Sequence, residues 1–304
     1  MLNDKAKKEM TRLCAARGGE VRFDYPVKLN STIAIGGNAP VWFVAASIEG
    51  LKEAKSLFED CEMDVFIMGG GSNVLIPDRD LRTAFINPGL GFFKEIKFEE
   101  GSVTVGSGVF LKRLIAECLR RGFASLEGLV GIPGTVGGAL VMNASYRSAI
   151  SDRLLKVLVL DDNGSIRWLD RSDISFGYRF SSFKKDTFIL QAVFRLEEDD
   201  PALIKGRLKS YFSEKMKKQP MGEKTLGCVF KNPTEGKYAS AELIDICGLK
   251  GSARGAAEIS AKHANFIVNR GGASYDDVLY LIKCVQEKVE KNFSVKLEPE
   301  IKIL

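Results

Sequence analysis

Cys228 lies in the stretch TLGCVFKNP (residues 225–233), after a glycine and before two hydrophobic residues, a lysine, an asparagine and a proline. A thiol in this setting can be a buried packing residue, a metal ligand, half of a disulfide or a proton donor. The chain has six cysteines, a single histidine (His263) and no Cys-x-x-Cys pair. Zinc sites and disulfide frameworks are therefore disfavoured, and no metal is expected. Most Ser-His-Asp and Cys-His schemes are also excluded unless His263 is the base, so packing and proton donation remain open for Cys228.

Two glycine-rich stretches indicate a second kind of chemistry. They are MGGGSNVLI (68–76) and GLVGIPGTVGGALVMNA (128–144). Consecutive glycines after a strand let backbone N–H groups converge on an anion, and Ser72 and Asn73 add side-chain donors. A single glycine cluster is more often a tight turn or a close backbone contact. Two such clusters favour a dinucleotide held between two loops.

The standard nucleotide fingerprints do not fit these loops. No G-x-x-x-x-G-K-[ST] pattern occurs, which excludes the P-loop. In VGSGVFL, Leu111 occupies the position where a Rossmann fold needs its third glycine. The sequence therefore predicts a dinucleotide site outside the Rossmann class.

A basic run, KGRLKSYFSEKMKKQP (205–220), precedes the Cys228 stretch. It has two interpretations: a solvated helix face, or an attractive field for a phosphorylated small molecule. The net charge of +5 over 304 residues does not by itself indicate nucleic-acid binding. No apolar run reaches the roughly 20 residues of a membrane helix, and the first residues lack the apolar core of a signal peptide. We therefore expect a cytoplasmic protein without membrane or nucleic-acid partners.

The elements that position these residues follow from the apolar pattern. Strands are expected within residues 64–71, 72–76, 102–108, 154–170 (a hairpin turning at 162–164), 187–198, 227–232, 263–269 and 294–304. Helices are expected within 109–122, 205–220, 240–251 and 275–293, the last opened by a capping box of Ser274 and Asp277. In the final strand, Val295, Leu297, Ile301 and Ile303 should share one buried face.

The chain is long enough for two or three domains, and the acidic stretch EEDDP (197–201) marks a boundary near residue 200. The predicted division is 1–88 and 89–199 for a two-part α+β region, followed by a smaller α+β domain at 200–304.

Seven motifs, in order and at similar spacing, resemble the UDP-N-acetylenolpyruvoylglucosamine reductase family. They are GGGSNVLIPD, GIPGTVGGALVMNA, GYRFSSF, GCVFKNP, LIDICGLKG, AEISAKHANFIVN and LEPEI. The resemblance implies a two-part FAD-binding region of the vanillyl-alcohol-oxidase-like type and a smaller C-terminal substrate domain. It also implies that hydride passes from NADPH through FAD to the enolpyruvyl group of a UDP-sugar. The short separation of GYRFSSF and GCVFKNP resembles the family type that lacks a substrate-covering insertion.

The resemblance also assigns residues. Arg179 and Glu300 would stabilise the enolate, Cys228 would protonate it, and a raised pKa is expected of Glu300. Lys218 and Asn232 would contact the substrate. The FAD-binding positions would be Gly69, Gly70, Gly71, Ser72, Asn73, Gly131, Ile132, Pro133, Gly134, Gly137, Gly138 and Ala139.

Without the resemblance, these residues leave alternatives open. Arg179 alone indicates a surface cation in a turn, and Glu298 and Glu300 lie on the same face of the final strand. Two departures from the family occur: Ala34 replaces a basic residue before GG, and SYRSAISD follows MNA where the family tends to read Gly-Ala-Tyr-Gly. The alternative functions are an FAD-linked alcohol oxidase or dehydrogenase, and a silent flavin or UDP-sugar binding module. A monomer is favoured, with the oligomeric state open.

Overall fold

The computed structural model describes residues 3–184 and 186–304. Its contacts divide the chain into two compact units. The large unit comprises Met1–Tyr25, Ala39–Gly70 and Arg82–Ser213, and the small unit comprises Pro26–Asn38, Gly71–Leu81 and Glu214–Leu304. Two short segments from the N-terminal half therefore belong to the small unit. The division at residues 88 and 199 stays a prediction.

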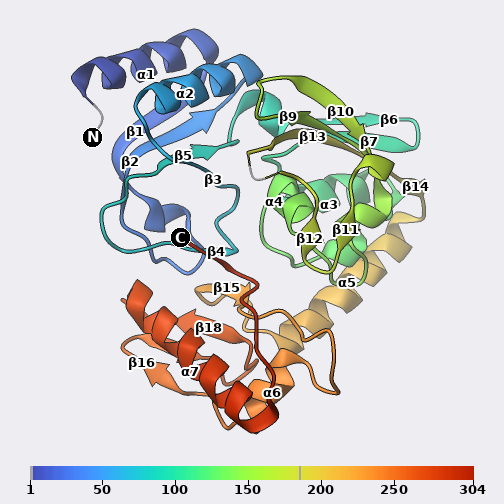
Figure 1. Ribbon diagram of the computed structural model, residues 1–304. Helices are drawn as coiled ribbons and strands as arrows, with labels where there is room; N and C mark the ends of the chain where they lie inside the picture. Colours follow the sequence, from blue (N-terminus) through green and yellow to red (C-terminus); the bar gives the residue numbers. More distant parts are fainter. Residues whose placement is uncertain (1–2, 185) are drawn as a thin grey trace. The chain divides into compact units, whose positions relative to one another are not determined.

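The first sheet of the large unit has the strand order β1-β2-β5-β3, formed by Gly19–Pro26, Asn38–Ala45, Ala84–Asn87 and Val65–Ile67. β5 pairs in parallel with both β2 and β3. Helices α1 (Asp4–Arg17) and α2 (Ile48–Asp60) begin at side-chain caps from Asn3 and Ser47. The two helices lie side by side against this sheet (Figure 1). Phe43 of β2 and Phe58 of α2 are buried in the shared core of the helices and the sheet.

The second sheet of the large unit is antiparallel, in the order β10-β9-β13-β7-β6. Its strands are Ile166–Asp170, Leu154–Leu160, Phe188–Arg195, Ser102–Gly106 and Ile96–Glu99. The predicted hairpin is confirmed, since β9 and β10 pair around a turn in which Gly164 has φ +75°. The predicted helix within 109–122 is also confirmed, as α3 (Leu111–Arg120). Its buried face packs into one core with α4 (Val136–Val141) and β13.

Short pairs complete the large unit. β11 (Phe176–Gly177) pairs with β12 (Phe180–Ser181), and β8 (Phe123–Ala124) pairs with β14 (Glu197–Glu198). The basic run forms the helix α5 (Pro201–Lys218). Single 3₁₀ turns occur at Val27–Asn30, Gly91–Lys94, Glu127–Leu129, Ile150–Arg153 and Arg171–Asp173.

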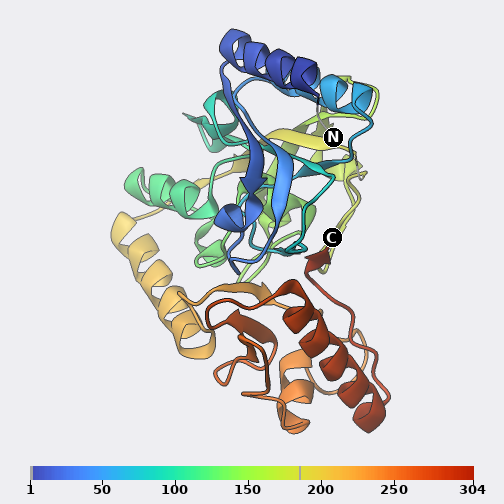
Figure 2. The same cartoon turned by 90° about the vertical axis from the view of Figure 1, so that its left-hand side faces the viewer.

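The small unit contains an antiparallel sheet in the order β15-β18-β17-β16. Its strands are Thr225–Cys228, Phe266–Asn269, Ala257–Ile259 and Ala253–Arg254. Helix α7 (Tyr275–Phe293) contacts β16 and β17 (Figure 2), and α6 (Ser240–Ile246) contacts α7. The capping box of Ser274 and Asp277 is confirmed.

The final strand is shorter than predicted. Only β19 (Lys302–Ile303) is regular, and it pairs in parallel with β4 (Val74–Leu75). Leu297 and Ile301 are buried as expected, but Ile303 is 37% exposed. Pro299, which has no N–H to donate, forms only an isolated bridge with Phe230. In the described part of the chain, no helix combines the length and the apolar character that crossing a membrane requires.

Candidate active site

Arg179 occupies the turn between β11 and β12, whose two connecting residues are Tyr178 and Arg179. Its φ is +54°, in the left-handed region that favours glycine. A residue with a side chain pays about 1–2 kcal/mol for this conformation. Such local strain gathers at functional sites, where the surrounding structure holds it in place. The turn therefore constrains the backbone of Arg179, and the role of this residue stays a prediction.

The segment after α4 holds this turn. The Asn143 amide donates to the carbonyl of Gly177 at 2.9 Å, and the Ser181 hydroxyl donates to the carbonyl of Val141 at 2.7 Å. The Arg179 guanidinium donates from Nη1 to the Ser145 hydroxyl at 2.8 Å and lies 5.2 Å from the centre of the Tyr178 ring. Both the backbone and the side chain of Arg179 are therefore positioned.

Cys228 ends β15 at an irregularity in the sheet. Thr225 pairs with Val268 and Cys228 with Phe266, so the register shifts between them, and Gly227 has φ +81°. A bulge of this kind redirects the side chain that follows it. Cys228 is half-buried, whereas Cys118 is buried and its burial raises the pKa of that thiol to about 12. Cys118 fits the role of a packing thiol better than Cys228 does.

Other roles for the cysteines find no support. All six are free thiols. Within residues 3–184 and 186–304, no group of three or more His, Cys, Asp or Glu side chains is arranged to hold a metal ion.

Glu300 lies beside the strand that continues from Cys228. The Glu300 N–H donates to the Val229 carbonyl at 2.7 Å, and the Lys231 N–H donates to the Glu298 carbonyl at 2.9 Å. Residues 229–231 and 298–300 are therefore paired, so Glu300 is bonded to the residue that follows Cys228. Glu298, by contrast, is 75% exposed and forms an ion pair with Lys231 at 3.3 Å.

A buried amide fixes this pairing, and the sequence did not single it out. The Asn265 side chain accepts the N–H of Phe230 at 2.9 Å and donates to its carbonyl at 2.8 Å. Asn265 is only 3% exposed. An asparagine within the apolar stretch HANFIVN was the available signal, because a buried amide needs such partners.

His263 orients this amide segment. Its Nδ1 accepts the Asn265 N–H at 3.3 Å. Burial lowers the pKa of His263, with a smaller effect from the charge of Lys250, so the neutral form that accepts this bond is favoured. The contact suits an orienting role better than acid–base catalysis.

The predicted FAD-binding glycines are divided between the units. Gly69 and Gly70 belong to the large unit, and Gly71, Ser72 and Asn73 belong to the small unit. In the small unit the Asn73 amide donates to the Glu300 carbonyl at 3.2 Å, and the Asn73 carbonyl accepts the N–H of Lys302 at 2.9 Å. Asn73 therefore supports the segment that carries Glu300.

In the large unit, the two glycine loops meet. A Cβ at Gly69 would lie 2.4 Å from Thr135 Oγ1, and one at Gly70 would lie 3.0 Å from the Gly134 Cα. Gly134 itself has φ +122°. Only residues without side chains allow this approach, which leaves backbone surface exposed in the manner that a pyrophosphate requires. The residues present therefore fit an FAD site.

The remaining predicted cofactor positions follow the second loop into α4. Gly131 has φ +71°, Gly137 lies against Ser107, and Gly138 donates its N–H to Thr135 Oγ1 at 3.4 Å. Ala139 is buried and Ile132 half-buried at the adjacent core.

The predicted substrate residues lie at two places in the small unit. Lys218 is the last residue of α5 and pairs with Glu214 at 3.1 Å. Asn232 follows β15, and its side chain accepts the Ser240 N–H at 3.1 Å at the start of α6. Within the basic run, Arg207 binds Glu127 and Asp199, each at 2.7 Å, so this charge is structural.

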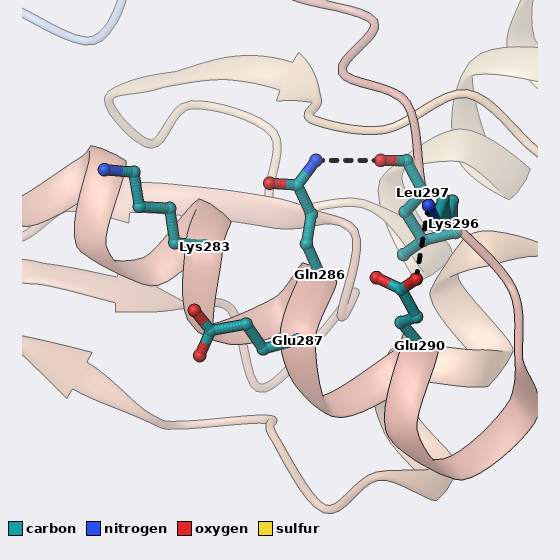
Figure 3. A pocket seen from close by; sticks show the side chains of 6 residues that line it. All are labelled: Lys283, Gln286, Glu287, Glu290, Lys296 and Leu297. Atoms are coloured by element: carbon teal, nitrogen blue, oxygen red, sulfur yellow. Dashed lines mark hydrogen bonds and ion pairs between the residues drawn. The ribbon is translucent and has the colours of Figure 1, made fainter.

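A shallow pocket of about 280 Å³ lies along α7 and contains none of the predicted site residues. Figure 3 shows Gln286 donating to the Leu297 carbonyl at 2.9 Å and Lys296 paired with Glu290 at 3.5 Å. Its lining is mostly charged, and we do not assign the active site to it.

Comparisons with known proteins identify the class and then the family. Residues 39–170 match the FAD binding domain, and residues 219–304 match the UDP-N-acetylenolpyruvoylglucosamine reductase C-terminal domain. Together with the close contact of the two glycine loops, these matches define a flavin-dependent oxidoreductase whose cofactor is FAD.

The relatives give the family. The chain is 38% identical to UDP-N-acetylenolpyruvoylglucosamine reductase of Halalkalibacterium halodurans, over 96% of this chain and 97% of that protein. It is 36% identical to the Clostridium botulinum reductase, over 93% and 92% of the two chains. The crystal structure of the Thermus caldophilus reductase superposes with a TM-score of 0.79 at 32% identity, covering 94% of this chain and 98% of that one. The chain belongs to the UDP-N-acetylenolpyruvoylglucosamine reductase family.

Family membership confirms the predicted resemblance and an α+β fold with an FAD-binding domain followed by the reductase C-terminal domain. The two-part division and the vanillyl-alcohol-oxidase-like type of the FAD-binding region stay predictions. It favours the reductase over an alcohol oxidase or a silent binding module. The roles of the individual residues are not given by these matches.

Proposed function

We propose that the protein reduces UDP-N-acetylglucosamine-enolpyruvate to UDP-N-acetylmuramate, a peptidoglycan precursor. The reaction adds a hydride to one carbon of the enolpyruvyl double bond and a proton to the other, with an enolate in between. FAD, when bound, supplies the hydride that it has received from NADPH. Support for this proposal comes from the pairing of 229–231 with 298–300, in which Glu300 is bonded to the residue that follows Cys228.

Cys228 donates the proton in this proposal. A thiol with a reference pKa of about 8.5 is protonated at neutral pH and acidic enough to quench an enolate carbon. The S–H bond breaks as the C–H bond forms, and the thiolate then regains a proton from water. Cys228 is half-buried rather than fully buried, which supports this role over that of a packing thiol.

Arg179 and Glu300 stabilise the enolate. The Arg179 guanidinium neutralises the charge that spreads onto the substrate carboxylate. Glu300 assists in a form that carries or shares a proton, because an ionised carboxylate would repel the enolate.

The cofactor and substrate positions complete the proposal. Lys218 and Asn232 contact the UDP-sugar. FAD is held by the loop positions Gly69, Gly70, Gly71, Ser72, Asn73, Gly131, Ile132, Pro133, Gly134, Gly137, Gly138 and Ala139. The reaction takes place in the cytoplasm, where UDP-sugars and NADPH are available, and it serves cell-wall synthesis, cell shape and division. We propose a monomer as the working state.

The decisive experiment separates the two half-reactions by following flavin absorbance in anaerobic stopped flow. In Cys228→Ala, NADPH should bleach the flavin at the normal rate. Reoxidation by the enolpyruvyl UDP-sugar should slow by about 10²- to 10⁴-fold, which is the contribution of a positioned general acid. Cys228→Ser should retain part of the rate.

Cys284→Ala is the matched control, since Cys284 is another half-buried thiol of the small unit, on α7. It should leave both half-reactions unchanged. Normal reoxidation in Cys228→Ala would show that Cys228 is a packing residue. If NADPH bleaches the flavin of the wild-type protein but the enolpyruvyl UDP-sugar does not restore its colour, the proposed reaction is overturned.

A further inference from the structure

We propose that Ser145 is a positioning residue that fixes the guanidinium of Arg179 for the enolate carboxylate. This inference rests on the proposed function of Arg179. It adds a residue to which neither the motifs nor the family matches assign a role.

The first observation is a direct contact. Arg179 Nη1 donates to Ser145 Oγ at 2.8 Å, within the normal range for such a bond. The two residues are far apart in sequence, and the contact exists because the β11–β12 turn lies on the segment that follows α4. Ser145 is part of the segment that holds the turn and is the residue in it that bonds the guanidinium.

The second observation is the position of Ser145. It follows Asn143 and Ala144 directly in the sequence, and the Asn143 amide donates to the carbonyl of Gly177. One short segment therefore bonds both the backbone of the turn and the guanidinium of Arg179.

The physical effect is preorganisation. A free arginine side chain carries about 2 kcal/mol of rotamer entropy, and its planar fork binds a carboxylate well only in one orientation. The hydrogen bond to Ser145 and the Tyr178 ring, whose centre lies 5.2 Å from the guanidinium carbon, together restrict the orientation of the guanidinium. A guanidinium held in one plane presents its planar fork to the substrate carboxylate in a fixed geometry.

The test uses the two half-reactions again. Ser145→Ala should slow flavin reoxidation by the enolpyruvyl UDP-sugar about tenfold, the scale of one hydrogen bond to a charged group. Bleaching by NADPH should not change. Ser145→Thr, which keeps the hydroxyl, should recover most of the rate.

Ser181→Ala is the matched control, because it removes a hydroxyl that anchors the same turn to Val141 without contacting the guanidinium. It should slow reoxidation much less than Ser145→Ala does, because the guanidinium keeps its acceptor. Equal losses in Ser181→Ala and Ser145→Ala would overturn the inference, since the effect would then arise from the stability of the turn.

A double-mutant cycle distinguishes this inference from the proposed function. In an Arg179→Ala background, Ser145→Ala should have no further effect on reoxidation. If Arg179→Ala slows reoxidation and Ser145→Ala does not, only the role of Ser145 is overturned. Normal reoxidation in Arg179→Ala would instead overturn the proposed function of the arginine.

Discussion

Glu298 and Glu300 share one face of the final strand expected from the sequence, but they have different surroundings in the fold. Glu298 extends to solvent and pairs with Lys231, whereas Glu300 is half-buried, and its backbone is bonded on both sides by Val229 and Asn73. Because an exposed ion pair contributes little, Glu298 is best explained by its surface position. The backbone of Glu300, by contrast, is held in place by these two bonds.

This difference gives a matched pair of variants. Glu300→Gln should slow flavin reoxidation by the enolpyruvyl UDP-sugar about a hundredfold, the usual loss when one group that stabilises an enolate is removed. Reduction by NADPH should be unaffected. Glu298→Gln should behave like the wild type in both half-reactions, and stopped-flow absorbance measures both. If the two variants were equally slow, or equally normal, the assignment of Glu300 would be wrong.

The glycine loops and the β15 bulge show at the level of elements what backbone geometry contributes. Gly70 allows the first loop to meet Gly134, and Gly227 redirects the strand just before Cys228. Both positions favour glycine: Gly70 because a Cβ would crowd Gly134, and Gly227 because its backbone is left-handed.

Gly70→Ala should weaken FAD binding about tenfold, because the added methyl would lie 3.0 Å from the Gly134 backbone and the loops must separate. Fluorescence titration of the apoprotein with FAD measures this affinity. Gly206→Ala is the control, since Gly206 lies in α5 with nothing within 4 Å of its Cβ position. It should leave FAD affinity unchanged and raise stability by about 0.5–1 kcal/mol. If Gly70→Ala binds FAD with unchanged affinity, the contact between the two glycine loops is not part of the FAD site.

The elements show where prediction from sequence succeeded and where it failed. The hairpin at 162–164 and the capping box of Ser274 depend on residues close in sequence, so local patterns found them. Three contacts join residues far apart in sequence: Asn265 with Phe230, Arg179 with Ser145, and Asn73 with Glu300. No periodicity reports such pairs, and only the family motifs marked some of their members.

At the scale of the whole molecule, the single histidine makes acid sensitivity simple to interpret. Burial lowers the folded-state pKa of His263 below the unfolded value of about 6.5. Between these two pKa values the unfolded chain binds more protons, so stability falls as the pH decreases through this window. Above about pH 6.5 the contribution of His263 is fully present.

We expect the melting temperature to decline from pH 7.5 to pH 5.5 and the decline to be shallower in His263→Asn. The asparagine side chain offers an oxygen acceptor for the Asn265 N–H and does not titrate. Scanning calorimetry at several pH values measures both proteins. Parallel curves for the variant and the wild type would mean that other groups cause the acid sensitivity.

The parallel pairing of β4 with β19 has a consequence for the order of events during synthesis. Val74 and Leu75 find their partners only when Lys302 and Ile303 have left the ribosome. At about 5–20 residues per second, this wait is on the order of tens of seconds. The end of the first glycine loop, at Asn73, therefore takes its final form only once those residues have been made. Maturation of this loop, which we propose holds FAD, is a late event in the life of each new chain.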